Sequence, residues 1–249
     1  MRTGIAWDRI EQFVGYGRVD APVVFLGMEE GQSSSASLES DLVYRSQFEP
    51  IIDLQTAHRG IDGTGKFFDP VGGSTQRTWR PMCELMIRRQ DAGGRPNRQS
   101  RLRYQALQLG RSHGDSLLTE LLPYPKRTAE AWPEIYGQRF RTRALYEQHM
   151  LPYRIELLSR LLAGYRRELV ICYGKANWSS YKQLANVAFG VGVEQWPAVP
   201  SDGALTVVAG GVRIVLTKHF SARDFNTDEQ LRKFVNVALH ERGELTGAN

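Results

Sequence analysis

The chain has 249 residues, of which 41% are hydrophobic and 24% charged, and its formal net charge is +5. This hydrophobic fraction is enough for a buried core and excludes a chain that is disordered throughout. No stretch approaches about 18 uncharged apolar residues, so we expect no membrane span. The first residues have no apolar signal-peptide core, which predicts a cytoplasmic protein. Two cysteines, Cys83 and Cys172, are too few for a disulfide framework or an all-cysteine metal site, and we expect both to be buried.

The sequence pattern predicts one alternating α/β domain over residues 1–249, with a tail at about 243–249. Apolar residues at helical spacing predict helices over residues 7–14, 38–54, 78–89, 98–109, 139–163, 175–187 and 227–242. Short apolar runs predict strands over residues 21–27, 116–122, 168–174, 206–209 and 212–216. A capping box of Thr227 and Gln230 is expected at the start of the last helix. This alternation implies a three-layer α/β/α arrangement around a central, mostly parallel sheet of four to five strands.

Positive charge is concentrated in the middle of the chain. Residues 77–167 hold 18 basic and 8 acidic residues, a net of +10, whereas the remainder has a net of −5. Arginine supplies 26 of the 32 basic residues, and its planar guanidinium suits bidentate contacts with phosphate. Such a segment favours an anionic partner, nucleic acid first. Arginines that form ion pairs or solvated helix faces would give the same composition.

Polar side chains follow three of the predicted strands. Residues 27–31 read Gly-Met-Glu-Glu-Gly and hold two carboxylates, Glu29 and Glu30. The second strand contains Glu120 near its end, and His219 follows the last strand. Because the carboxyl ends of parallel strands meet at one edge of a sheet, we expect these side chains to lie close together. Taken singly, an acidic turn also fits a solvent-facing loop or a helix cap, and a lone histidine also fits a structural role.

Five segments, in chain order, resemble motifs of the uracil-DNA glycosylase superfamily. Residues 23–31 resemble the first strand and its water-activating GMNPG motif, and residues 77–82 resemble the start of the helix after the base-pocket loop. Residues 119–125 are similar to the strand end that reads the base, and residues 169–176 to the third strand with its LGxxA turn. Residues 211–223 resemble the last strand running into HPSPR. The resemblance extends over nearly the whole chain and implies a uracil-DNA-glycosylase-like fold.

The resemblance implies a monofunctional DNA glycosylase that acts in DNA repair as a monomer, without a metal or other cofactor. Such an enzyme hydrolyses the N-glycosidic bond of uracil or another damaged base flipped out of single- or double-stranded DNA. Glu29 matches the residue that positions the attacking water, with Glu30 beside it, and His219 matches the donor to the base oxygen. The other candidate positions are Met28, Phe68, Thr119 and Glu120 for the base, and Lys175, Lys218, Ser221 and Arg223 for DNA. For the aromatic residue that stacks on the base, Phe67 and Tyr44 are alternatives to Phe68.

The motifs depart from the family pattern in three places. Glu30 replaces a proline, so the roles of Glu29 and Glu30 are not separated by the sequence. Glu120 stands near the family's base-reading asparagine, and an ionised carboxylate there only accepts hydrogen bonds and would repel O4 of uracil, unless Glu120 faces solvent. Phe220 replaces a proline and is expected to loosen its turn. These departures keep open a catalytically silent nucleic-acid-binding member of the fold and, as a third possibility, a hydrolase of free nucleosides or nucleotides.

Overall fold

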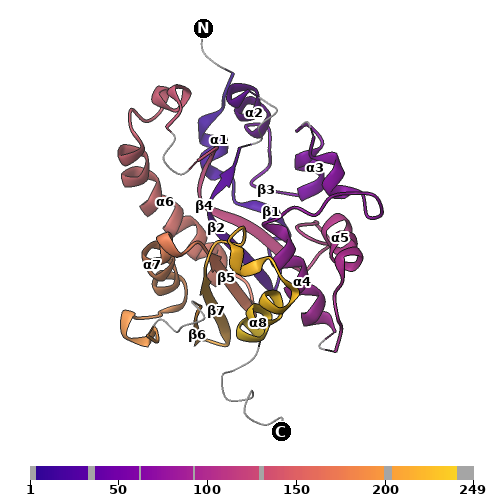
Figure 1. Ribbon diagram of the computed structural model, residues 1–249. Coiled ribbons are helices and arrows are strands. Elements are labelled where there is room, and N and C mark those ends of the chain that lie inside the picture. Colours follow the sequence, from indigo (N-terminus) through magenta and orange to yellow (C-terminus); the bar gives the residue numbers. More distant parts are fainter. Residues whose placement is uncertain are drawn as a thin grey trace.

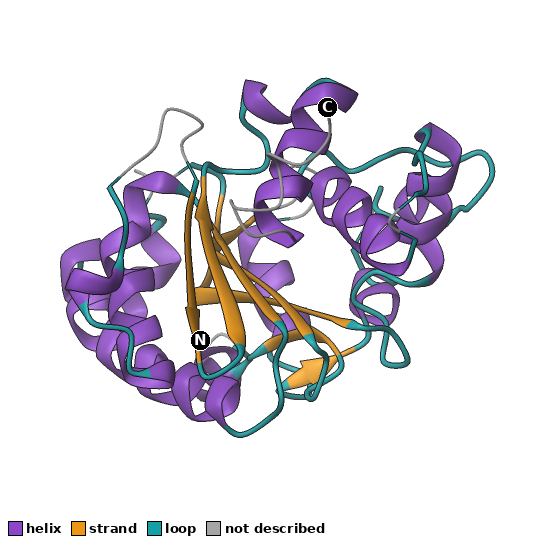
Figure 2. Cartoon of the chain, turned by 90° about the horizontal axis from the view of Figure 1, so that it is seen from below, coloured by secondary structure: helices purple, strands orange, loops and turns teal. Residues whose placement is uncertain are grey.

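The computed structural model describes residues 4–32, 37–61, 63–91, 93–128, 132–198 and 204–239, so the expected tail lies outside the described residues. A central sheet is covered by helices on both faces (Figures 1 and 2). The sheet has the order β3-β1-β4-β2-β5-β7-β6. Its strands are β1 (Gly15–Gly17), β2 (Val23–Gly31), β3 (Ile51–Ile52), β4 (Ser116–Lys126), β5 (Leu169–Tyr173), β6 (Leu205–Ala209) and β7 (Val212–Thr217). The α/β class and the five predicted strands are confirmed.

The predicted sheet of four to five strands is too small, because the described sheet has seven strands and mixed directions. Strands β4, β2, β5 and β7 form a parallel centre, whereas β1 is antiparallel to β4 and β6 is antiparallel to β7. Strands β1 and β3 have three and two residues, too few to produce an apolar run in the sequence. In β1, a Cβ on Gly15 would lie 2.0 Å from the carbonyl oxygen of Leu118, so glycine allows the close approach of β1 to β4.

Strands β2 and β4 extend further than predicted, and the acidic segment 27–31 is a strand instead of a turn. Glu29 pairs with Leu122 and Gly31 with Lys126, so two residues advance along β2 while four advance along β4. Pro123 and Pro125 lie within this irregular stretch, where their missing N–H groups do not interrupt a regular ladder. The prolines therefore shift the register of the strand pair without ending it.

The helices are α1 (Trp7–Gln12), α2 (Leu38–Arg45), α3 (Leu54–His58), α4 (Trp79–Gln90), α5 (Arg98–Leu107), α6 (Arg143–Ala163), α7 (Trp178–Phe189) and α8 (Asp228–Leu239). The single helix predicted over residues 38–54 is wrong, because α2, β3 and α3 occupy this range. Pro50 cannot donate a helical hydrogen bond and disfavours a helical conformation at Glu49. Helix α6 starts at Arg143, four residues later than predicted, and the side chain of Thr142 caps it.

The expected capping box of α8 is confirmed. The hydroxyl oxygen of Thr227 accepts from the backbone N–H of Gln230 at 3.2 Å, and Oε1 of Gln230 accepts from the backbone N–H of Thr227 at 3.0 Å. These reciprocal bonds satisfy two of the N–H groups that a helix leaves unpaired at its start. No helix within the described ranges is long and apolar enough to cross a membrane.

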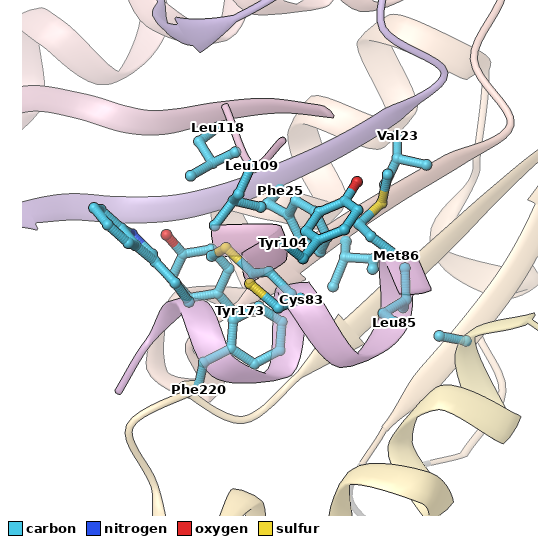
Figure 3. Packing of buried hydrophobic residues seen from close by; sticks show 14 of the residues in the cluster. Val23, Phe25, Cys83, Leu85, Met86, Tyr104, Leu109, Leu118, Tyr173 and Phe220 are labelled. Atoms are coloured by element: carbon cyan, nitrogen blue, oxygen red, sulfur yellow. The ribbon is translucent and has the colours of Figure 1, made fainter. Parts of the chain in front are cut away.

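Apolar side chains fill both faces of the sheet. Helices α4 and α8 pack on one face, together with Phe25 and Tyr173 of the sheet, and α6 and α7 pack on the other. Cys83 and Cys172 are buried in these two layers as predicted, and burial raises the pKa of both thiols. Figure 3 shows Cys83 of α4 close to Tyr173 and Phe220.

Arg154 of α6 is only 1% exposed and joins three segments of the chain. Its guanidinium donates to four backbone carbonyl oxygens at 2.7–3.1 Å, those of Glu11, Phe13, Glu120 and Leu121. Burial lowers the pKa of Arg154 to about 10, so the side chain is still charged at neutral pH. The four carbonyls therefore replace the water that this cation would otherwise bind.

Replacing Arg154 with methionine should lower the free energy of unfolding by about 3–5 kcal/mol, because four buried carbonyl oxygens lose a charged donor. Urea denaturation at neutral pH measures the change. The matched control is Arg160→Met on the same helix, where the side chain is 78% exposed and the change should stay within about 0.5 kcal/mol. Equal effects of the two substitutions would contradict the structural role of Arg154.

Candidate functional site

The candidate site lies at the carboxyl ends of three neighbouring strands, β4, β2 and β5. The chain passes from β2 to β4 on one side and then returns past β2 to β5 on the other side. In open α/β sheets, ligands bind beyond the strand ends where the order reverses in this way. Gly27 of β2 lies in register with Glu120 of β4 at this point. A Cβ on Gly27 would lie 2.1 Å from Oε2 of Glu120 and 2.6 Å from the hydroxyl oxygen of Tyr173, so the glycine leaves room for both groups.

Glu120 has one paired and one unpaired carboxyl oxygen. The hydroxyl of Tyr173 donates to Oε1 at 2.8 Å, whereas Oε2 is buried and has no hydrogen-bond partner among the described residues. Burial, together with the charges of Glu30 and Glu29, raises the pKa of Glu120 to about 8. Glu120 therefore lies over Gly27 instead of facing solvent. At neutral pH it is mostly a neutral acid that both donates and accepts, in place of the expected ionised group that only accepts.

Tyr173 connects Glu120 to the segment after β7. Its ring stacks on Phe220, with ring centroids 4.7 Å apart, and the two side chains lie together in Figure 3. It also meets the ring of His219 edge-on, at a centroid distance of 5.5 Å. Phe220 is only 1% exposed and packs in the core, so it anchors this segment, contrary to the looser turn expected from the lost proline.

His219 is held in one tautomer by Ser221. The backbone N–H of Ser221 donates to Nδ1 of His219 at 3.2 Å, and the hydroxyl oxygen of Ser221 lies 2.7 Å from the same nitrogen. A neutral ring with this acceptor has its proton on Nε2. Although the residue is exposed overall, partial desolvation lowers the pKa of His219, which favours the neutral form at pH 7. Nε2 is therefore a hydrogen-bond donor at this edge of the sheet.

Glu30 belongs to a buried ion-pair network. Its carboxylate accepts from Arg45 at 2.6 and 3.2 Å and from the hydroxyl of Tyr16 at 2.7 Å. Arg45 is itself buried and also donates to Asp41 at 3.0 Å. Burial opposes ionisation of Glu30, but the guanidinium of Arg45 outweighs it and holds the pKa of Glu30 below its usual value. Glu30 is therefore a fixed negative charge at neutral pH.

Glu29 contacts a different set of cations. Its Oε2 lies 2.6 Å from Nζ of Lys126 and 3.3 Å from Arg143. Burial raises the pKa of Glu29 to about 7, and the charge and hydrogen bond of Arg143 oppose the rise. Neighbouring residues of a strand point to opposite sides, which explains why Glu29 and Glu30 have separate partners. The structure thus distinguishes two carboxylates that the sequence left equivalent.

A cavity of about 60 Å³ lies at this site. That volume admits a few water molecules. Glu29 and His219 are not among its lining residues. Its walls are formed by Phe13, Val14, Gly15, Tyr16, Glu30, Leu54, His58, Trp79, Met82, Leu118, Thr119, Glu120, Leu122, Pro123, Arg154 and Tyr173. Of the predicted site residues, the cavity therefore brings together Glu30, Thr119 and Glu120.

The other predicted base-binding residues contribute little to the cavity. The hydroxyl of Thr119 donates to the backbone oxygen of Val14 and has a structural role. Met28 packs among apolar residues next to α6. Phe68 is buried against His58 and Trp79, and its alternatives Phe67 and Tyr44 do not line the cavity either. Phe13, Tyr16, Trp79 and Tyr173 are the large aromatic residues that do.

The predicted DNA-binding residues follow β5 and β7 at the same edge of the sheet. Lys175 is exposed and lies over the ring of Trp178, 5.8 Å from its centroid. Lys218 forms an ion pair with Asp224 at 2.7 Å, and Arg223 is exposed. Ser221 has its hydroxyl on His219. These positions leave a contact with a phosphate backbone as a prediction.

Much of the positive charge in the middle of the chain is paired within the protein. Arg154 and Arg167 donate to backbone carbonyl oxygens. At least eight other arginines of residues 77–167 form ion pairs with carboxylates: Arg80, Arg88, Arg89, Arg101, Arg111, Arg139, Arg143 and Arg160. The large number of arginines in this segment is therefore weaker evidence for a nucleic-acid partner than the composition suggested.

Sequence reasoning missed Tyr173 and Arg45, the two side chains that hold Glu120 and Glu30. Tyr173 is the next-to-last residue of a predicted strand, directly before Gly174, so its position at the carboxyl edge was available as a signal. Arg45 lies four residues after Asp41 on a helix, which predicts their ion pair. Its second partner, Glu30, comes from another element and gives no signal in the sequence.

Replacing Gly27 with alanine should lower the free energy of unfolding by about 1–3 kcal/mol, because the added methyl group overlaps the carboxyl of Glu120 and the hydroxyl of Tyr173. Thermal or urea unfolding measures this. Gly31→Ala in the same strand is the control, since nothing lies within 4 Å of a Cβ at that position. A Gly27→Ala variant as stable as Gly31→Ala would show that Glu120 does not occupy the place described.

No protein-family model matches the chain, and no curated protein matches it. The resemblance to uracil-DNA glycosylases therefore rests on the motif residues alone. What the described residues establish independently is an α/β sheet with Glu30 and Glu120 in one cavity at its carboxyl edge and His219 beside Tyr173.

Proposed function

We propose that this protein hydrolyses the N-glycosidic bond of uracil or another damaged base that is flipped out of DNA. The observation that carries the proposal is that residues of four strand ends meet at one edge of the sheet. Glu120 of β4 bonds to Tyr173 of β5, which contacts His219 after β7, and Glu30 of β2 shares the cavity with Glu120. The motif resemblance supports the same reaction, because it assigns roles to residues of these same segments.

The charges of the site suit this reaction. When an N-glycosidic bond breaks, positive charge develops on the sugar and negative charge on the leaving base. A fixed carboxylate such as Glu30 stabilises a cationic sugar electrostatically. A neutral histidine with its proton on Nε2, as Ser221 arranges for His219, can donate to an oxygen of the departing base.

Base binding also requires the cavity to open. Its present volume of about 60 Å³ admits only a few water molecules. The proposal therefore includes a movement of its walls when a flipped nucleotide enters. Phe13, Tyr16 and Trp79 are aromatic wall residues from outside the parallel centre of the sheet.

The test is release of base from single- and double-stranded oligonucleotides that carry uracil, hypoxanthine, xanthine or an oxidised pyrimidine, at stoichiometric protein. We expect abasic product from at least one of them. His219→Ala should lower the rate about 10²–10³-fold, because a preorganised donor is lost. The control is Arg160→Met, which changes an exposed side chain of α6 and should leave the rate of base release unchanged. The absence of abasic product from every substrate would contradict the proposal.

A catalytically silent nucleic-acid-binding protein is the second candidate. It is favoured by Glu29, which matches the water-positioning residue but contacts Lys126 and Arg143 and does not line the cavity. This candidate predicts DNA binding that weakens steeply as salt rises, because phosphate contacts release counterions. It also predicts unchanged DNA binding in His219→Ala and no abasic product. Binding that is insensitive to salt would exclude it.

A further inference from the structure

We propose that Glu120 is the proton donor of this site and that Tyr173 is its positioning residue. In this assignment Oε2 of Glu120 carries the proton and delivers it to the base as the base leaves. The inference rests on the proposed function and adds a role that the motif resemblance does not supply. It also defines the substrate as a base that presents a hydrogen-bond acceptor, a carbonyl oxygen or a ring nitrogen, to Glu120.

The hydrogen bonds distinguish the two oxygens of Glu120. Oε1 accepts from the hydroxyl of Tyr173 at 2.8 Å, and Oε2 is buried with no partner in the described parts of the chain. A buried carboxylate oxygen without a donor is unfavourable, because it has lost water and gained nothing in exchange. A proton on Oε2 removes that charge. The bond from Tyr173 keeps Oε1 as the acceptor, so the proton belongs on Oε2.

The surrounding charges favour the protonated acid. Among the described residues, the titratable and charged groups around Glu120 are Glu29 and Glu30 of β2, Tyr16 of β1, His58 of α3, Tyr173 of β5, Arg154 of α6 and Tyr181 of α7. Burial and the negative charges of β2 raise the pKa of Glu120 to about 8, while Tyr173 and Arg154 lower it. The donor groups of Arg154 are directed at backbone carbonyl oxygens and not at the Glu120 carboxyl. At pH 7 the acid is therefore mostly protonated.

The neighbouring groups are less suited to give a proton. Arg45 keeps Glu30 ionised. The pKa of the Tyr173 hydroxyl is raised well above its usual value by burial, and its proton is already in the bond to Glu120. Two carboxyl groups whose pKa values are moved in opposite directions are typical of an acid and a charge-stabilising partner. Glu120 fits the first role and Glu30 the second.

The proposed reaction is the hydrolysis of the N-glycosidic bond. The bond between C1′ of the sugar and the base nitrogen breaks, and its electron pair stays on the base while the Oε2 proton moves to an acceptor atom of the base. A water oxygen forms the new bond to C1′, and the proton that this water releases returns to the Glu120 carboxylate through solvent. The products are a sugar hydroxyl and a neutral base. Bases whose facing edge has only N–H donors cannot take this proton and are excluded.

A titration of the carboxyl carbons by ¹³C NMR tests the position of the proton without any substrate. The signal that Glu120→Gln removes should titrate near pH 8. Tyr173→Phe should move this titration to higher pH, because it removes a bond that favours the ionised form. Tyr165→Phe changes an exposed tyrosine and should leave the titration unmoved. Titration of Glu120 near the ordinary value for a glutamate would overturn the inference.

Single-turnover base release tests the catalytic step. The rate of the unmodified protein should fall as the pH rises through about 8, because the acid loses its proton. Tyr173→Phe should move this fall to higher pH and leave KM for DNA unchanged. Glu120→Gln keeps the shape of the side chain but has no acidic proton, so its rate of base release should be about 10²–10⁴-fold lower. Full activity of Glu120→Gln would overturn the assignment.

The two measurements separate the possible failures. Absence of base release from every substrate, with Glu120 titrating near pH 8, would overturn the proposed function and with it the destination of the proton. Base release with Glu120 ionised at pH 7 would keep the proposed function and overturn Glu120 as its acid. Base release together with the expected titration supports both.

Discussion

The site depends on one close packing arrangement, that of the Glu120 carboxyl and the Tyr173 hydroxyl over the bare backbone of Gly27. Each of the three residues comes from a different strand, and the parallel register of β2, β4 and β5 brings them together. Gly27 cannot carry a side chain without displacing the other two. The stacking of Tyr173 on Phe220 then ties the segment that carries His219 to the same point. Because these residues are in direct contact, a substitution at any one of them displaces or releases the side chains beside it.

Neighbouring cations give the carboxyl groups of the site different protonation states. Arg45 holds Glu30 as an anion, and Lys126 and Arg143 hold Glu29 on the opposite side of its strand. Within the described part of the chain no cation forms an ion pair with Glu120, since the donors of Arg154 are directed at backbone carbonyls. It therefore stays mostly neutral at pH 7. One edge of the sheet thus presents a fixed negative charge and a neutral acid, the combination that the proposed hydrolysis uses.

Much of the fold could be predicted from the sequence, because long apolar runs and helical spacing reflect burial directly. All five predicted strands are present, and Thr227 and Gln230 cap α8 as expected. The failures have local causes. Strands β1 and β3 are too short to have a pattern of their own, and Pro50 interrupts a helical spacing that otherwise continues. The prolines of β4 indicated a strand end, but pairing with β2 carries the strand past them to Lys126.

The sequence by itself determined the layered α/β fold and the edge of the sheet where Glu29, Glu30, Glu120 and His219 gather, because strand direction alone brings carboxyl ends together. Only the tertiary structure decided which of these side chains share a cavity and in which protonation state. The protonation states depend on Arg45, Tyr173 and Arg154, which contact Glu30 and Glu120 from distant parts of the chain. The pKa of a buried carboxyl is set by the donors and charges around it, and these are properties of the packed structure.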